Sequence, residues 1–117
     1  MARINRGTIV VGRVPQGGTF KVRPVVVIQN DRNNARLSNV IAAMLTTSTR
    51  LATIEDTQVL VDLSDPANQQ TGLLHTSAVK CENLYTLPIR DVRVIGSMPK
   101  TIMQKVDEAL KASLALK

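Results

Sequence analysis

The sequence predicts a mainly β (α+β) fold, in which a curved antiparallel sheet or small barrel is closed by a C-terminal α-helix. Short runs rich in valine and isoleucine recur at close spacing through residues 8–96, and turn-forming residues separate them. The last segment instead repeats its apolar residues at three- and four-residue steps. The chain has 117 residues, the usual length of one domain, so we expect residues 1–117 to form a single domain.

The first two predicted strands flank a turn. Residues 8–14 form an apolar run, and residues 15–18 (Pro-Gln-Gly-Gly) interrupt it, as proline and glycine do in turns. Residues 23–29 include four consecutive β-branched residues, which indicates burial on both faces or a strongly bent central strand. Because proline donates no ladder hydrogen bond, we expect Pro24 only at the first positions of this strand.

The middle of the chain alternates between polar loops and further strands. Residues 30–38 are polar and predict a loop, whereas residues 39–46 form an apolar run that ends in hydroxyl side chains. Residues 47–57 predict a mobile polar loop, and the alternating residues 58–63 predict a half-buried strand. The remaining predictions in this region are a turn-rich loop at 64–70 and short strands at 77–81, 84–87 and 91–96.

The C-terminal segment predicts an amphipathic helix, and Pro99 suits its first turn. Asp107 and Lys111 are spaced to form an i,i+4 ion pair on its outer face. We expect the apolar face to pack on the sheet, with a helix that binds a partner as the alternative. That face would contain Ile102, Met103, Val106, Ala109, Leu110, Ser113 and Leu114.

The charge of the chain indicates a polyanionic partner. Fifteen Lys and Arg residues against nine Asp and Glu residues give a net charge of +6, which favours nucleic acid, an acidic membrane surface or an acidic protein. Phe20 and Tyr85 are the only aromatic residues, which excludes a single-strand binder built on several stacked aromatics. Contacts with RNA would therefore depend on cations and hydroxyl groups.

Several other classes of protein are disfavoured. A lone cysteine, Cys81, excludes an internal disulfide and a Cys-rich zinc site, and the lone His75 disfavours a His-ligated metal centre. We expect Cys81 to be buried and inert, and His75 to be structural or on the surface. The sequence contains no phosphate-binding loop, no apolar run long enough to span a membrane and no apolar leader. We therefore expect a cytoplasmic protein without a metal or cofactor.

Two predicted strand ends carry side chains that suit phosphate chemistry. Arg23 opens one strand, and the hydroxyl cluster at residues 46–49 closes another. A guanidinium group can donate two hydrogen bonds to a phosphate, while a threonine hydroxyl can hold a further phosphoryl oxygen. Glu82, just beyond the run at 79–81, can take or relay a proton. This pattern is compatible with a phosphodiester site.

Several blocks of the sequence carry a resemblance to a known family. The most specific is RPVVVIQND at residues 23–31. The others are residues 6–7 (Arg-Gly), 40–47 (VIAAMLTT), 72–73 (Gly-Leu), 79–87 (VKCENLYTL) and 106–110 (VDEAL). Together they resemble the MazF/PemK (Kid) toxin family, in the same order and over nearly the whole chain.

The resemblance implies a toxin of a type II toxin–antitoxin system with an SH3-like barrel. Toxins of this kind are sequence-specific, metal-independent endoribonucleases that cleave single-stranded mRNA. We therefore expect attack by the RNA 2′-OH to give a 2′,3′-cyclic phosphate and a 5′-OH. The resemblance also implies a homodimer that is blocked by a cognate acidic antitoxin lying in the RNA groove.

The resemblance also implies roles for individual residues. Arg23 matches the family arginine that acts on the scissile phosphate and in proton transfer, and Thr46 matches the threonine that holds this phosphate. Thr47 matches a small polar neighbour, and Lys80 and Glu82 match a basic and acidic pair near the cleavage site. Either Glu82 or the arginine would be the general base. We expect further RNA contacts from Lys21, Arg13, Arg50 and Phe20.

Three departures from the family pattern leave the recognised RNA sequence open. Thr8 replaces a common acidic residue, Tyr85 replaces a common arginine, and the loop at residues 15–22 is about two residues short. Two alternative functions also remain. One is a toxin of similar fold that poisons DNA gyrase by binding, as CcdB does, and the other is an inactive RNA-binding module.

Overall fold

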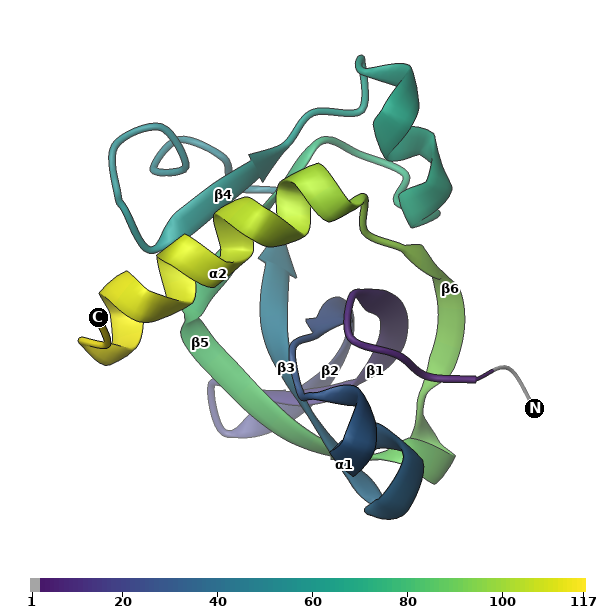
Figure 1. Ribbon diagram of the computed structural model, residues 1–117. Helices are drawn as coiled ribbons and strands as arrows, with labels where there is room; N and C mark the ends of the chain where they lie inside the picture. The colour runs from purple at the N-terminus through teal and green to yellow at the C-terminus, as the bar shows by residue number, and fades with distance from the viewer. Residues whose placement is uncertain (1–2) are drawn as a thin grey trace.

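An antiparallel sheet of six strands forms the framework of the computed structural model, which describes residues 3–117 (Figure 1). The strand order is β4–β5–β3–β2–β1–β6. In Figure 1, α2 lies across β4 and β5, and the curved sheet carries β6 to the opposite side of the view. The strands are β1 (Thr8–Gln16), β2 (Thr19–Val27), β3 (Asn39–Thr46), β4 (Gln58–Val61), β5 (Ser77–Pro88) and β6 (Arg93–Ser97). The helices are α1 (Asp31–Arg36), η1 (Pro66–Thr71), η2 (Ile89–Asp91) and α2 (Lys100–Leu114).

Strands β1 and β2 form a tight hairpin. Gln16 pairs with Thr19, so the turn consists of Gly17 and Gly18 alone. Both glycines have positive φ, which a two-residue turn between twisted strands requires. The predicted turn at residues 15–18 was therefore too long, because Pro15 and Gln16 continue the strand and pair across the hairpin.

Pro24 lies inside β2 rather than near its beginning. On one side it faces Val11 of β1, and on the other side the ladder to β3 begins only at Val25. The missing N–H of Pro24 therefore falls where β2 has a neighbour on one side only. Pro24 was expected at the first positions of its strand, and this is wrong for β2 as a whole. It does, however, come directly before the portion of β2 that is paired on both sides.

The polar segment at residues 30–38 contains a short helix, where the sequence predicted a loop. Asn30 caps α1 by accepting a hydrogen bond from the Asn33 backbone N–H at 2.8 Å. Asn34 is buried, and its side chain exchanges hydrogen bonds with Gln29 at 2.9 and 3.0 Å. This buried amide pair joins α1 to the end of β2. The predicted turn-rich loop at residues 64–70 likewise contains a helix, η1.

The two strands predicted at residues 77–81 and 84–87 are one long strand, β5. Lys80 pairs with Met44, yet Leu84 pairs with the adjacent Ala43, so the residues between Lys80 and Leu84 form a bulge. The bulge is held from outside the sheet, because the Ser113 hydroxyl of α2 donates to the Cys81 carbonyl at 2.9 Å. Strand β4 is shorter than predicted, and three of its four residues are buried, which corrects the half-buried expectation.

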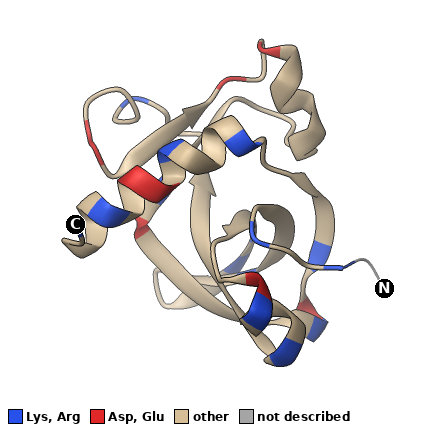
Figure 2. Ribbon diagram, in the orientation of Figure 1, with Lys and Arg blue, Asp and Glu red and all other residues tan. Residues whose placement is uncertain are grey.

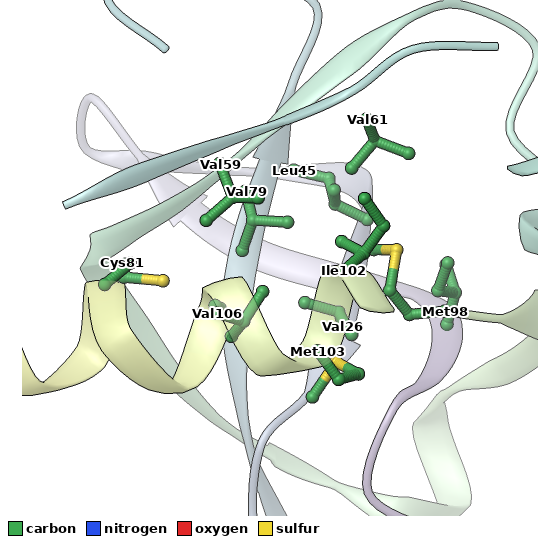
Figure 3. Packing of buried hydrophobic residues seen from close by; sticks show 13 residues of the cluster. Val26, Leu45, Val59, Val61, Val79, Cys81, Met98, Ile102, Met103 and Val106 are labelled. Carbon is green, nitrogen blue, oxygen red and sulfur yellow. The ribbon is translucent and has the colours of Figure 1, made fainter. Parts of the chain in front are cut away.

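Helix α2 covers one face of the sheet, as its apolar spacing predicts. Figure 3 shows Ile102, Met103 and Val106 facing Val26 and Val79 of the sheet. These side chains belong to the larger core cluster, whose buried members also include Leu45, Val59, Val61, Cys81, Met98 and Ala109. A second cluster on the other face gathers Val10, Val14, Val25, Val27, Val40, Ala42 and Leu87. The mainly β fold with a C-terminal helix is confirmed.

Three details of α2 differ from the sequence predictions. Leu114 is 51% exposed and lies outside the core, and Pro99 is the N-cap residue rather than a residue of the first turn. Lys111 pairs with Glu108 at 3.4 Å instead of with Asp107. The Asp107 carboxylate instead faces the Arg6 guanidinium at 2.7 Å, because Arg6 also donates to the Ile28 carbonyl and is thereby fixed beside the helix.

Candidate active site

Arg23 and Thr46 lie where β2 and β3 separate. The two strands pair from Val25–Met44 to Val27–Ala42. Continuing this register by two residues places Arg23 opposite Thr46, and residues opposite each other project from the same face of a sheet. Both residues are partly exposed. The predicted guanidinium and hydroxyl therefore share the face that carries the second core cluster, and they lie at its partly exposed end.

The Arg23 guanidinium is held by a neutral partner. Its Nε donates to the Gln16 side-chain oxygen at 3.4 Å across the hairpin. Within residues 3–117, no carboxylate forms an ion pair with Arg23. Its positive charge is therefore not neutralised and can meet an incoming phosphate. Gln16 was not predicted from the sequence, although the register of a tight hairpin places it on the same face as Arg23.

Thr46 is oriented by its own loop. Its Oγ1 accepts a hydrogen bond from the Ser48 backbone N–H at 3.1 Å. A hydroxyl that accepts in this way keeps its own proton, so Thr46 can still donate to a phosphoryl oxygen. Thr47 follows it and is exposed. The hydroxyl cluster thus supplies one fixed donor at the strand end, with a second polar residue beside it.

Lys80 and Glu82 come to this region from β5. Lys80 pairs with Met44 on one side and with Gln58 of β4 on the other, so it shares the face of Met44 and Thr46. Glu82 lies in the bulge of β5 and is exposed. Its carboxylate accepts a hydrogen bond from the Gln58 side-chain amide at 3.1 Å. Gln58, a buried amide that orients this candidate acid–base residue, was not predicted from the sequence.

Tyr85 occupies the position at which the family resemblance implies an arginine. It pairs with Ala42, and its hydroxyl contacts the Met44 sulfur at 3.8 Å. Tyr85 therefore places an aromatic ring, rather than a cation, beside Met44 on the face that carries Lys80. The residue was identified from the sequence as a departure, but its contact with Met44 depends on the β3–β5 register.

The other predicted RNA contacts divide between the two faces of the hairpin. Lys21 pairs with Val14 and shares the face of Arg23, whereas Arg13 and Phe20 project from the opposite face. The Arg13 guanidinium lies over the Phe20 ring, 5.1 Å from its centre. Arg50 is exposed in the loop that follows Thr46. The structure thus gathers Arg23, Thr46, Lys80 and Lys21 on one face and separates Arg13 and Phe20 from them.

Comparison with known families identifies the chain. A sequence model described as the PemK-like, MazF-like toxin of type II toxin–antitoxin systems matches residues 5–114. The chain belongs to this family. The endoribonuclease MazF6 of Mycobacterium tuberculosis (strain ATCC 25618 / H37Rv) is 39% identical over 98 residues, covering 82% of this chain and 81% of the relative. The endoribonuclease EndoA of Bacillus subtilis (strain 168) is 35% identical over 102 residues, covering 86% and 80%.

Solved structures agree with this assignment. The Mycobacterium tuberculosis toxin MazF-mt6 superimposes with a TM-score of 0.75 at 28% identity, covering 94% of this chain and 98% of that one. A mycobacterial endoribonuclease in complex with its cognate antitoxin also gives a TM-score of 0.75, at 27% identity and 97% coverage of both chains. The resemblance stated from the sequence is confirmed. These relatives favour an endoribonuclease toxin over a CcdB-like gyrase poison.

The remaining candidate nucleophile and metal ligands lie apart from this face. Cys81 is fully buried against α2, and His75 is exposed in the loop before β5. Within the described residues 3–117, no three His, Cys, Asp or Glu side chains are grouped so that they could hold a metal ion. Over the same residues, no helix is long and apolar enough to cross a membrane.

The Cys81 thiol of the native toxin is expected to resist alkylation at pH 8. Burial raises its pKa from 9.0 to about 12, and the negative charge of Glu82 adds to this effect. Reaction with iodoacetamide should therefore be slow in buffer and fast in denaturant, which mass spectrometry can measure. Between pH 9 and 12 the thiol ionises only in the unfolded chain, so its contribution to stability falls by up to about 1.4 kcal/mol per pH unit. Rapid alkylation of the folded protein would contradict the buried position of Cys81.

Proposed function

We propose that this toxin is a sequence-specific, metal-independent endoribonuclease that cleaves single-stranded mRNA. The observation that carries the proposal is the β2–β3 ladder, which ends at Val25–Met44 and leaves Arg23 and Thr46 two residues beyond it, both partly exposed. RNA carries its own nucleophile in the 2′-OH. Cleavage therefore needs a base for that proton, stabilisation of the charged phosphorane and an acid for the leaving 5′-oxygen.

Arg23 and Thr46 act on the scissile phosphate. The Arg23 guanidinium stabilises the negative charge of the phosphorane and supplies a proton to the leaving 5′-oxygen. The Thr46 hydroxyl donates to a second phosphoryl oxygen and fixes the phosphate for in-line attack. The products are a 2′,3′-cyclic phosphate and a 5′-OH. This division of roles is supported by the uncompensated charge of Arg23 and by the Ser48 hydrogen bond that orients Thr46.

Glu82 takes the proton from the 2′-OH. Its carboxylate is exposed at the bulge of β5 and is oriented by Gln58, which leaves its other oxygen available to accept the proton. If Arg23 itself removes this proton, as the family resemblance also allows, Glu82→Gln would leave the turnover rate unchanged. The flanking phosphates are held by Lys80, Lys21, Thr47 and Arg50. Arg13 and Phe20 contact only an RNA that passes round the β1–β2 hairpin.

The same family membership supports a proposal for the assembly. We infer a single toxin domain over residues 1–117 that acts in the cytoplasm as a homodimer and is blocked by a cognate acidic antitoxin. The net charge of +6 suits an acidic inhibitor as well as RNA.

An RNA whose sugars are all 2′-deoxy is expected to resist cleavage completely. The substitution removes the attacking hydroxyl while leaving the phosphates that Arg23 and Thr46 contact, so binding should persist. Gel electrophoresis of matched RNA and DNA oligonucleotides measures cleavage, and fluorescence anisotropy measures binding. A single 2′-deoxy substitution at the cleavage site serves as the stricter control. Cleavage of the all-deoxy strand at the normal rate would rule out attack by the 2′-OH.

A further inference from the structure

Arginines gather at the end of the molecule formed by η2, the start of β6 and the N-terminal segment. Figure 2 shows these cations close to those of α1, at one end of the sheet. Arg90 and Arg93 belong to this group, as does Arg3, and all three are exposed. Arg13 extends the group along β1. We call Arg3, Arg13, Arg90 and Arg93 the arginine track.

Three neighbouring clefts lie along the arginine track. One cleft, of about 360 Å³, lies between Arg13, Phe20 and Asp91. It shares Val92 with a second cleft of about 520 Å³, which Arg3 and Arg93 line. A third cleft, of about 390 Å³, lies beside Arg90 and shares Pro88 with the first and Ile89 with the second. The three clefts therefore border one segment, residues 88–94.

Three of the four arginines of the track have no ion-pair partner within residues 3–117. The Arg90 guanidinium has one acidic neighbour, Asp91, at 3.8 Å, and its side chain is 87% exposed. In the part of the chain that the structure describes, Arg3, Arg13 and Arg93 form no ion pair. Asp31, which lines the larger cleft, accepts hydrogen bonds from the Arg6 backbone N–H and from the Asn34 amide. The track therefore presents guanidinium groups that are free to bind anions.

We propose that the arginine track is a second RNA-binding surface, which holds the strand beyond the nucleotides cut at Arg23 and Thr46. This inference rests on the proposed endoribonuclease function and concerns a separate part of the surface. Guanidinium groups at intervals along a hollow match the repeating phosphates of a strand. The apolar floor formed by Ile4, Ile89 and Val92 suits unstacked bases.

The acidic residues in the clefts favour RNA over an acidic peptide. Asp31 lines the second cleft and Asp91 the first. Carboxylates can accept hydrogen bonds from the amino groups of bases, as Glu and Asp do from cytosine. The side chains of an acidic protein segment offer no such donors, whereas RNA supplies phosphates for the arginines and amino groups for the carboxylates. An acidic antitoxin remains the expected inhibitor at the catalytic face.

The track also has a path to the catalytic face. Gly12 pairs with Arg23, and the next residue, Arg13, projects from the other face of the same hairpin. A strand that leaves Arg23 and turns round the edge of the hairpin therefore meets Arg13 and Phe20 first. The neighbouring clefts beyond these residues are lined by Arg90 and Arg93. Only an RNA longer than the cleavage site itself can reach this far.

The test compares a double variant on the track with a double variant elsewhere. Arg90→Gln with Arg93→Gln removes two exposed charges from the track, and Lys100→Gln with Lys105→Gln removes two exposed charges from α2. Cleavage is measured on RNAs of about 6 and about 20 nucleotides that contain the same cut site. For the track variant we expect KM on the longer RNA to rise about 10-fold with kcat unchanged, and no change on the shorter RNA. The α2 variant should match the wild type.

The salt dependence gives an independent readout. Loss of two phosphate contacts should reduce the slope of log affinity against log salt by about 1.4 for the longer RNA. Equal behaviour of the track and α2 variants on the longer RNA would overturn the proposal, as would weakened binding of a purified antitoxin with RNA binding unchanged. If the wild type cleaves neither RNA, the proposed function fails, and anisotropy with the longer RNA still decides whether the track binds it.

Discussion

Arg23→Ala is expected to reduce the rate of RNA cleavage by at least about 10²–10³-fold, because it removes the cation that the extended β2–β3 register brings toward Thr46. The lost interaction is made mainly with the phosphorane, where the negative charge on the oxygens increases. The fall should therefore appear in kcat, with a smaller effect on KM. Single-turnover cleavage of a labelled RNA measures it directly. The fold should persist, because the side-chain hydrogen bond of Arg23 goes to the exposed Gln16 and Arg23 itself is partly exposed.

Three further variants separate catalysis from general electrostatics. Lys21→Ala removes a charge from the same face and should act mainly through KM, while Arg36→Ala removes an exposed arginine of α1 and should leave cleavage unchanged. Thr46→Ala should lower kcat, and when combined with Arg23→Ala it should cost less than the sum of the two single effects, since both residues act on one phosphate. Full activity of folded Arg23→Ala protein would refute the assigned role.

The regular elements could be predicted because their signals are local. The apolar run at residues 39–46 became β3 within the predicted bounds, and the spacing of Ile102, Met103 and Val106 placed the core face of α2 correctly. Helix α1 could not be predicted in this way, because its six residues are too few for a periodic signal. It is anchored by the buried Gln29–Asn34 pair, which exists only in the folded chain.

The candidate site was only partly predictable, since it depends on register. Arg23 and Thr46 could be named from their strand ends, but their opposition follows from the β2–β3 pairing. The bulge in β5 was read as a gap between two strands, so neither the position of Glu82 nor its hydrogen bond from Gln58 could be foreseen. A long-range amide contact of this kind leaves no pattern in the sequence.

Gly72→Ala is expected to lower the free energy of unfolding by about 3 kcal/mol or more. Gly72 ends η1 in the left-handed region, at φ +71°, where a side chain costs about 1 kcal/mol. A Cβ there would also overlap the Ile95 carbonyl oxygen of β6. The obstacle is backbone, so no rotamer change can relieve it, and overpacking adds about 1–3 kcal/mol. A Cβ on Gly96 would overlap the Thr71 carbonyl in the same way. The backbones of η1 and β6 therefore approach too closely for a side chain at either glycine.

Gly17→Ala is the matched control for this prediction. Gly17 also has positive φ, at +59°, but a Cβ there would meet nothing within 4 Å. Gly17→Ala should lower the free energy of unfolding by only about 1 kcal/mol, the cost of placing a side chain on a left-handed backbone. Urea unfolding of the two variants therefore separates the close approach of η1 and β6 from left-handed backbone strain. Strand β6 leads directly into α2, and Ser113 of α2 holds the Cys81 carbonyl at the bulge of β5. The Gly72→Ala variant should therefore lose RNA cleavage at the urea concentration at which it unfolds. Equal stability of the two variants would show that the backbones can separate at little cost.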